Sequence, residues 1–286
     1  MYEVIRANIW KSRLLIILFI IITSAIIYVF SKVYGNPIVI VIGGLFVIGA
    51  PIAGHYAGDK IILSLSGARN ADRDDYPHYI NSVEGLALAA GLPTPKAYVI
   101  DDTAPNAFAT GRDPEHSAIC VTTGLLELMN RVELEGVIAH EMSHIKNYDS
   151  RLMMIISILV GFIALLADWI RWGDIRSIKK DNAPIMLLWI ILLVFSPIVA
   201  MCMQAFISRR REYLADSDAA LLTRYPPGLA SALKKIRDDK HKLQNVNRAT
   251  AHLYIVNPIN DHGWKANKLY NTHPPIDERI KILEEM

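Results

Sequence analysis

The sequence has few cysteines, and the two present form no recognisable framework. Cys120 and Cys202 lie far apart and have no metal-ligand spacing between them. Neither a disulfide scaffold nor a thiolate metal site is supported, and a reducing, cytosolic environment fits the chain.

A strong charge of either sign is also missing. The formal net charge is only +2, which is too small to indicate a nucleic-acid partner. Internal repeats and low-complexity segments, which would indicate a solenoid or a disordered chain, are not seen either.

Apolar residues are abundant instead. Of the 286 residues, 52% are hydrophobic and 20% are charged, and the mean hydropathy is +0.26. This is too apolar for an ordinary soluble domain and too charged for a pure membrane bundle. The composition therefore predicts membrane spans together with one water-exposed domain.

Four apolar runs are candidates for the spans. A helix needs about 20 apolar residues to cross a bilayer. The third run has only 16 residues. It is therefore either a transmembrane span that is barely long enough for the bilayer or a hydrophobic helix buried against protein. The first run has no cleavage site after it, which favours a retained anchor over a signal peptide. The runs are Leu14–Phe30, Pro37–Tyr56, Leu152–Ala167 and Ala183–Ile207.

Basic residues around these runs predict the orientation. They precede the first run and follow the second and the fourth, which places the N-terminus, residues 57–150 and residues 208–286 in the cytoplasm. The basic residues of the loop 168–182 depart from this pattern. We expect an N-terminal membrane region at residues 1–56 and the first part of a cytoplasmic domain at 57–151. Two hydrophobic helices are expected at 152–207, and the second part of the cytoplasmic domain at 208–286.

The water-exposed segments show local signals of secondary structure. Helical periodicity ending in Gly91 predicts a helix over 76–91. Asn130, with Glu133 three residues later, predicts the start of a helix that continues to about Ser150. Strands are predicted at 95–101 and from His116, with turn chemistry between them at 101–111. Further helices are expected at 207–225, at 228–246 and near the C-terminus.

The segment His140-Glu141-Met142-Ser143-His144 matches H-E-x-x-H. On a helix, residues four apart lie one above the other, so both imidazoles can reach one Zn²⁺ ion. Glu141 would then act on a metal-bound water as a general base. An accident of composition is the alternative interpretation of this motif.

A catalytic zinc ion needs a third protein ligand and one open position. Glu212 is the candidate, and Asp216, one turn later, could orient a ligating histidine. Alternatively, both acids only neutralise the arginines that precede them. The two apolar runs between His144 and Glu212 return the chain to the same side of the membrane, so the pairing is topologically allowed.

At this point the chain resembles the M48 family of membrane metallopeptidases. HEMSH, "SRRREYLADSDAA", "PNAFATG" and "THPPIDERI" carry the resemblance, which covers nearly the whole length. It implies a mainly α integral membrane protein, with about four transmembrane helices and a helical zincin (gluzincin) domain that contains a small β-sheet. It also implies that one Zn²⁺ ion is held by His140, His144 and Glu212, with Glu141 as the base and Asp216 supporting a ligand.

The resemblance suggests further roles with open alternatives. The segment Asn106, Ala107, Phe108 and Ala109 would run along the cleft and pair with extended substrate, although Asn106 could simply occupy a turn. His273 and Arg279 would stabilise the oxyanion, as in the related CAAX prenyl protease, although His273 could instead be a capping residue. Asp149 could also support a ligand, but a capping or solvent-facing role is favoured at the end of its helix.

The motif and the resemblance together imply a zinc endopeptidase of the cell membrane that cleaves misfolded or membrane proteins at the cytoplasmic face, and the resemblance implies a role in protein quality control and the stress response. Its expected partners are polypeptide substrates and the lipid bilayer. One rival is a CAAX-type or defined-motif processing protease, and the other is a membrane scaffold with structural zinc. A fourth protein ligand would favour the scaffold, and candidates are His55, His78, His116, His241, His252 and His262. Natural substrates and the oligomeric state stay open.

Overall fold

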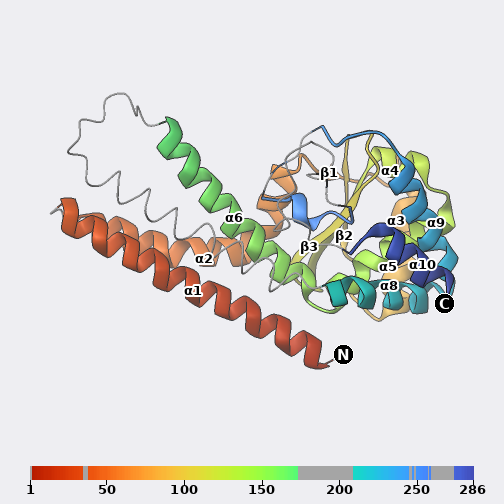
Figure 1. Cartoon of the computed structure of the whole chain (residues 1–286), viewed down its shortest axis with the longest axis horizontal. Helices are drawn as coiled ribbons and strands as arrows, with labels where there is room; N and C mark the ends of the chain where they lie inside the picture. The colour runs from red at the N-terminus through yellow and green to blue at the C-terminus, as the bar shows by residue number, and fades with distance from the viewer. Residues whose placement is uncertain are drawn as a thin grey trace.

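Three long helices extend away from a mixed α/β part in the computed structural model (Figure 1). The structure describes residues 2–34, 38–172, 209–244, 247, 249–256, 258 and 274–286. The long helices are α1 (Tyr2–Tyr34), α2 (Ile38–Leu65) and α6 (Asp149–Trp172). They pack on one another, and Leu15 of α1 lies in a small buried cluster with Leu152, Ile155 and Ile156 of α6.

A four-stranded mixed sheet lies in the α/β part. Its strands are β1 (Arg69–Asn70), β2 (Lys96–Ile100), β3 (Ala107–Asp113) and β4 (His116–Thr122), in the order β1-β2-β4-β3. The pair β2 and β4 is parallel, and the other two pairs are antiparallel. Strand β3 is therefore at one edge of the sheet.

The turn predicted over residues 101–111 is wrong for its second half. Residues 107–111 belong to β3, because pairing with β4 across the hairpin overrides the local turn chemistry of Asn and Gly. Gly111 has φ +142, and a Cβ there would lie 2.3 Å from the carbonyl oxygen of His116. Only glycine fits this close approach at the irregular end of the hairpin.

Helix α5 (Arg131–Lys146), whose Val137, Ile138 and Met142 are buried, packs against α3 (Pro77–Ala90), α8 (Arg209–Thr223) and α9 (Pro226–Asp238). A Cβ on Gly136 would meet the backbone nitrogen of Leu229 at 2.8 Å, so α5 and α9 pack in close contact. The described residues also form α4 (Thr123–Leu128), α10 (Ile276–Glu284) and the 3-10 turn η2 (Ala251–Leu253).

Helix ends show which local signals held. Gly91 ends α3 with φ +67, and Asn130 and Glu133 form the reciprocal capping box of α5, both as predicted. Helix α5 ends at Lys146, earlier than expected, because Tyr148 turns the chain with φ +59 and α6 begins at Asp149. Helix α9 ends at Asp238, well short of the predicted residue 246.

The structure is mainly helical with a small sheet, as predicted, but it does not confirm the count of spans. Among the described residues, no helix combines the length and the apolar character needed to cross a membrane. The fourth apolar run, residues 183–207, lies outside the described residues. The four-segment division stays a prediction, and its boundary at residue 56 lies inside α2.

Candidate metal centre

Helix α5 presents two histidines on one face. The capping box fixes where this helix begins: Asn130 Oδ1 accepts from the backbone of Glu133 at 3.0 Å, and Glu133 Oε2 accepts from the backbone of Asn130 at 2.9 Å. His140 and His144 then lie one turn apart, with their rings edge to face at a centroid distance of 4.8 Å. Their Nε2 atoms are 3.2 Å apart.

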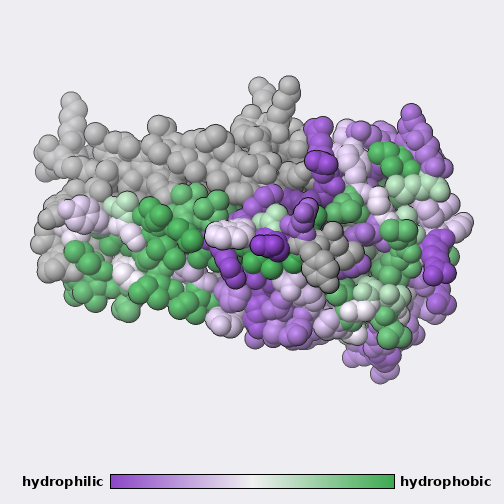
Figure 2. Space-filling model, turned by 90° about the horizontal axis from the view of Figure 1, so that it is seen from below, coloured by the Kyte–Doolittle hydropathy of each residue, from purple (hydrophilic) through white to green (hydrophobic). Residues whose placement is uncertain are grey.

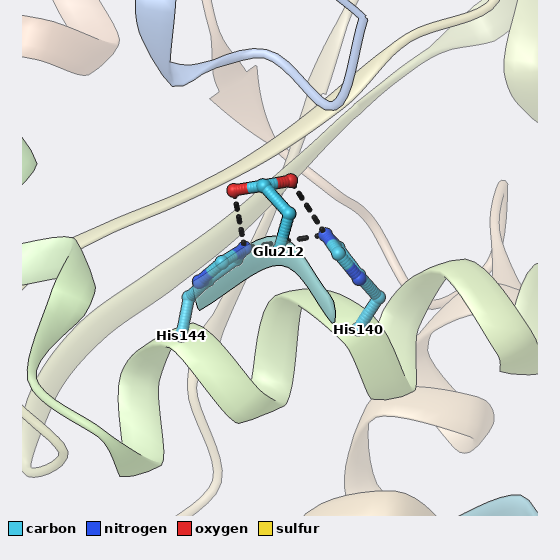
Figure 3. A group of neighbouring side chains, drawn as sticks. All are labelled: His140, His144 and Glu212. Atoms are coloured by element: carbon cyan, nitrogen blue, oxygen red, sulfur yellow. Dashed lines mark hydrogen bonds and ion pairs between the residues drawn. The ribbon is translucent and has the colours of Figure 1, made fainter. Parts of the chain in front are cut away.

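Helix α8 brings Glu212 to the same point (Figure 3). Glu212 Oε2 lies 3.7 Å from His140 Nε2, and Glu212 Oε1 lies 3.7 Å from His144 Nε2. One donor atom from each of the three residues falls within 4.8 Å of the others. The structure thus brings together the three residues that the sequence selected as ligands.

The donor set fits a zinc ion. In a tetrahedral site with bonds of about 2.0–2.1 Å, neighbouring donor atoms lie roughly 3.3–3.4 Å apart. The observed separations of 3.2 and 3.7 Å bracket that value. Two imidazoles and one carboxylate are also the protein ligands of known hydrolytic zinc sites, which keep a fourth position for water or substrate.

Those candidate fourth ligands that the structure describes do not join this cluster. Within the part of the chain that the structure describes, the only group with metal-ligating geometry is His140, His144 and Glu212. His252 Nε2 instead lies 3.2 Å from Ser157 Oγ, and His116 Nδ1 lies 2.7 Å from Asp113 Oδ1. His262 lies outside the described residues.

A buried ion pair holds the outer nitrogen of His140. His140 Nδ1 lies 3.0 Å from Asp216 Oδ1, and Arg279 donates to both oxygens of Asp216, at 2.8 and 2.7 Å. Burial raises the pKa of Asp216, but the charge of Arg279 and the hydrogen bonds outweigh burial and lower it. Burial and the charge of Arg279 lower the pKa of His140 to about 4. The lowered pKa favours the neutral form of His140, which is the form that binds a metal.

His144 has its own carboxylate partner. Asp149 Oδ2 lies 3.2 Å from His144 Nδ1, and Asp149 is only 3% exposed. Burial lowers the pKa of His144, but Asp149 and Glu212 outweigh burial and raise the pKa to about 9. A metal ion that binds His144 would therefore displace a proton from its imidazole. The solvent-facing role favoured for Asp149 is therefore wrong: the left-handed Tyr148 turns the chain back and directs this carboxylate at His144.

The other predicted site residues have mixed positions. Glu141 is buried on α5, next to His140. Arg279 is fully buried on α10, and its Nη1 lies 3.6 Å from Glu212 Oε2 in addition to its contacts with Asp216. His273 lies outside the described residues. The oxyanion role of His273 and Arg279 stays a prediction.

The predicted substrate segment, residues 106–109, starts just before edge strand β3 and runs into it. Part of its outer edge is already paired: the backbone nitrogen of Ile255 donates to the carbonyl oxygen of Ala107 at 2.9 Å. The side chain of Asn106 also donates to the carbonyl oxygen of Val256 at 2.9 Å. Local sequence analysis missed this contact, because 150 positions separate Asn106 from Val256.

Comparison with known proteins identifies relatives over the full length. A family model described as "Peptidase family M48" matches residues 77–286. "Protease HtpX homolog" of Dictyoglomus turgidum is 44% identical over 289 residues, which cover 100% of this chain and 94% of that protein. The protein of the same description from Caldanaerobacter subterraneus subsp. tengcongensis is 45% identical over 296 residues, covering 100% of this chain and 98% of that protein.

A solved structure shares the fold. The crystal structure of S. mikatae Ste24p matches with a TM-score of 0.51 and 20% sequence identity, over 99% of this chain and 67% of that chain. At this identity the match concerns the fold alone.

Proposed function

The chain belongs to peptidase family M48 and is a metalloprotease similar to the HtpX homologs, and on that basis we propose that it is a zinc endopeptidase. Its substrates in this proposal are misfolded or membrane proteins. The observation that carries the proposal is the meeting of His140, His144 and Glu212, from two helices, with donor atoms within 4.8 Å of one another.

Each buried residue of the centre has a part in this proposal. Bound zinc supplies a Lewis acid and lowers the pKa of a water molecule toward about 7. Glu141 accepts the proton of the attacking water and passes it to the leaving amine. Asp216 holds the outer nitrogen of His140, so that Nε2 faces the metal position. Arg279 orients Asp216 through its two-pronged contact.

Apolar surface supports a membrane location. Figure 2 shows hydrophobic residues gathered over the outer part of the long helices, whereas hydrophilic residues dominate much of the α/β part. A contiguous apolar surface of this kind is rare on soluble monomers and indicates contact with lipid or with protein. We place this surface in the cell membrane, with the metal centre on its cytoplasmic side. Exposed apolar side chains on α1 and α2 include Leu14, Ile17, Ile21, Val41, Leu45 and Ile48.

The test compares wild type, Glu141→Gln and Glu135→Gln in detergent. Glu135 lies on the same helix but pairs with Arg131 at 2.8 Å, away from the metal cluster. We expect one zinc ion per chain in all three proteins, and casein cleavage by wild type and Glu135→Gln only. Retained cleavage by Glu141→Gln would refute the base assignment.

The same preparation separates the two rivals. Cleavage of one defined motif, with unfolded casein left intact, would favour a processing protease. X-ray absorption showing four protein ligands and no water would favour a structural zinc site. In the proposed function, casein is cut and three protein ligands are found.

A further inference from the structure

Helix α1 contributes a side chain to the surroundings of the metal centre. Asn8 is only 1% exposed, although it lies on a helix with a long apolar run. Its Nδ2 donates to Asp149 Oδ1 at 2.8 Å and to the carbonyl oxygen of Asn147 at 2.9 Å. A buried amide on such a helix is costly unless its hydrogen bonds are satisfied. Here one acceptor lies in the turn after α5 and the other on the first residue of α6.

Asp149 is the point where the different elements meet. Its Oδ2 contacts His144 on α5, and its Oδ1 accepts from Asn8 on α1 and from Arg211 Nη1 on α8 at 3.1 Å. Arg211 directly precedes Glu212, so one carboxylate connects the two helices that carry all three candidate ligands. Removing any of these donors would change how firmly that carboxylate is held.

From these contacts we propose that Asp149 is a positioning residue for His144, and that Asn8 of α1 holds Asp149 in place. The inference rests on the proposed zinc site. A carboxylate at Nδ1 fixes the tautomer and the ring direction of His144, so that Nε2 presents its lone pair to the metal. Asn8 adds donors without adding charge, while Arg211 balances the charge of Asp149. Helix α1 thus supports the metal centre directly.

The experiment uses the full-length chain in detergent and measures zinc affinity by chelator competition. The variants are Asp149→Asn, Asn8→Leu and Asn8→Ala. Ser12→Ala is the matched control: Ser12 is buried one turn along α1, and its hydroxyl donates within the helix, to the carbonyl oxygen of Asn8 at 2.8 Å. Thermal unfolding of each metal-free protein shows whether the variant is folded.

We expect Asp149→Asn to weaken zinc binding by about 10–100-fold, as for other outer partners of ligating histidines. Either Asn8 variant that folds should weaken it by about 5–10-fold, in line with the loss of roughly one intramolecular hydrogen bond. Ser12→Ala should match wild type. The zinc affinity of each variant is compared with that of wild type in the absence of substrate, so the result does not depend on any effect on cleavage.

Two results would overturn the inference. If Asp149→Asn binds zinc with wild-type affinity, Asp149 does not position His144. If a folded Asn8→Leu or Asn8→Ala variant binds zinc with wild-type affinity, α1 does not support the metal centre. Both differ from a failure of the proposed function, in which wild-type protein binds no zinc or Glu141→Gln still cleaves casein.

Discussion

Arg279 offers the sharpest test of how the centre is held together. Its guanidinium is buried at 1% exposure and makes two hydrogen bonds to the buried Asp216. Replacing Arg279 by Met keeps much of the side-chain volume but leaves Asp216 charged without its main partner. Breaking a buried pair in this way costs about 3–5 kcal/mol.

This cost predicts a measurable shift in melting temperature. A unit of 150–250 residues shifts by about 2–4 °C per kcal/mol, so Arg279→Met should lower Tm by roughly 6–20 °C. The measurement uses metal-free protein in detergent, because bound zinc would stabilise the folded state by mass action. Removing both charges, in Arg279→Met with Asp216→Leu, should recover a large part of the loss.

An exposed arginine on the neighbouring helix serves as the control. Arg237 pairs with Asp277 of α10 at 2.8 Å, so it also links α9 to α10, but at the surface. Solvent screening makes such pairs weak, and Arg237→Ala should melt close to wild type. If Arg279→Met also melts within about 2 °C of wild type, Asp216 does not depend on Arg279 and the argument fails.

Three further predictions concern packing, pH and metal. Gly136→Ala should destabilise by about 1–3 kcal/mol in thermal unfolding, because its Cβ would meet the backbone of Leu229, whereas Gly85→Ala, with nothing within 4 Å, should not. Burial raises the pKa of Glu133, but hydrogen bonds from Lys235 and others outweigh burial and lower it. The stability that ionised Glu133 adds is therefore present above its usual pKa, and it is lost as the pH falls through the lowered pKa of the folded state. The free energies of unfolding of Glu133→Gln and wild type should therefore converge at acidic pH. A difference between the two proteins that does not depend on pH contradicts this. Chelation should lower the wild-type Tm and added zinc should restore it; an unchanged Tm would argue against a bound metal.

The two histidines of the metal cluster were predictable because their signals are local. Two histidines four residues apart must share a helix face, and the pair Asn130 and Glu133 marks where that helix starts. The third residue, Glu212, was chosen by the chemistry that zinc requires and by topological parity. The structure brings Glu212 to both histidines.

The contacts around the cluster were less predictable because they depend on tertiary structure. A left-handed Tyr148 has no sequence signature, yet it ends α5 and places Asp149 against His144. Asn8 belongs to no recognisable motif, and its partner Asp149 lies 141 positions away in the sequence. The turn chemistry before Gly111 misled for the same reason, since strand pairing outweighed it.

The edges of the sheet bear on aggregation. Strand edges with free backbone groups recruit other strands, a hazard for a protein whose proposed substrates are unfolded chains. At one edge, β1 has only two residues. At the other, Ile255 already occupies the carbonyl group of Ala107. An unfolded chain that pairs with β3 at Ala107 must first break the hydrogen bond from Ile255. This cost disfavours the addition of further strands at that position.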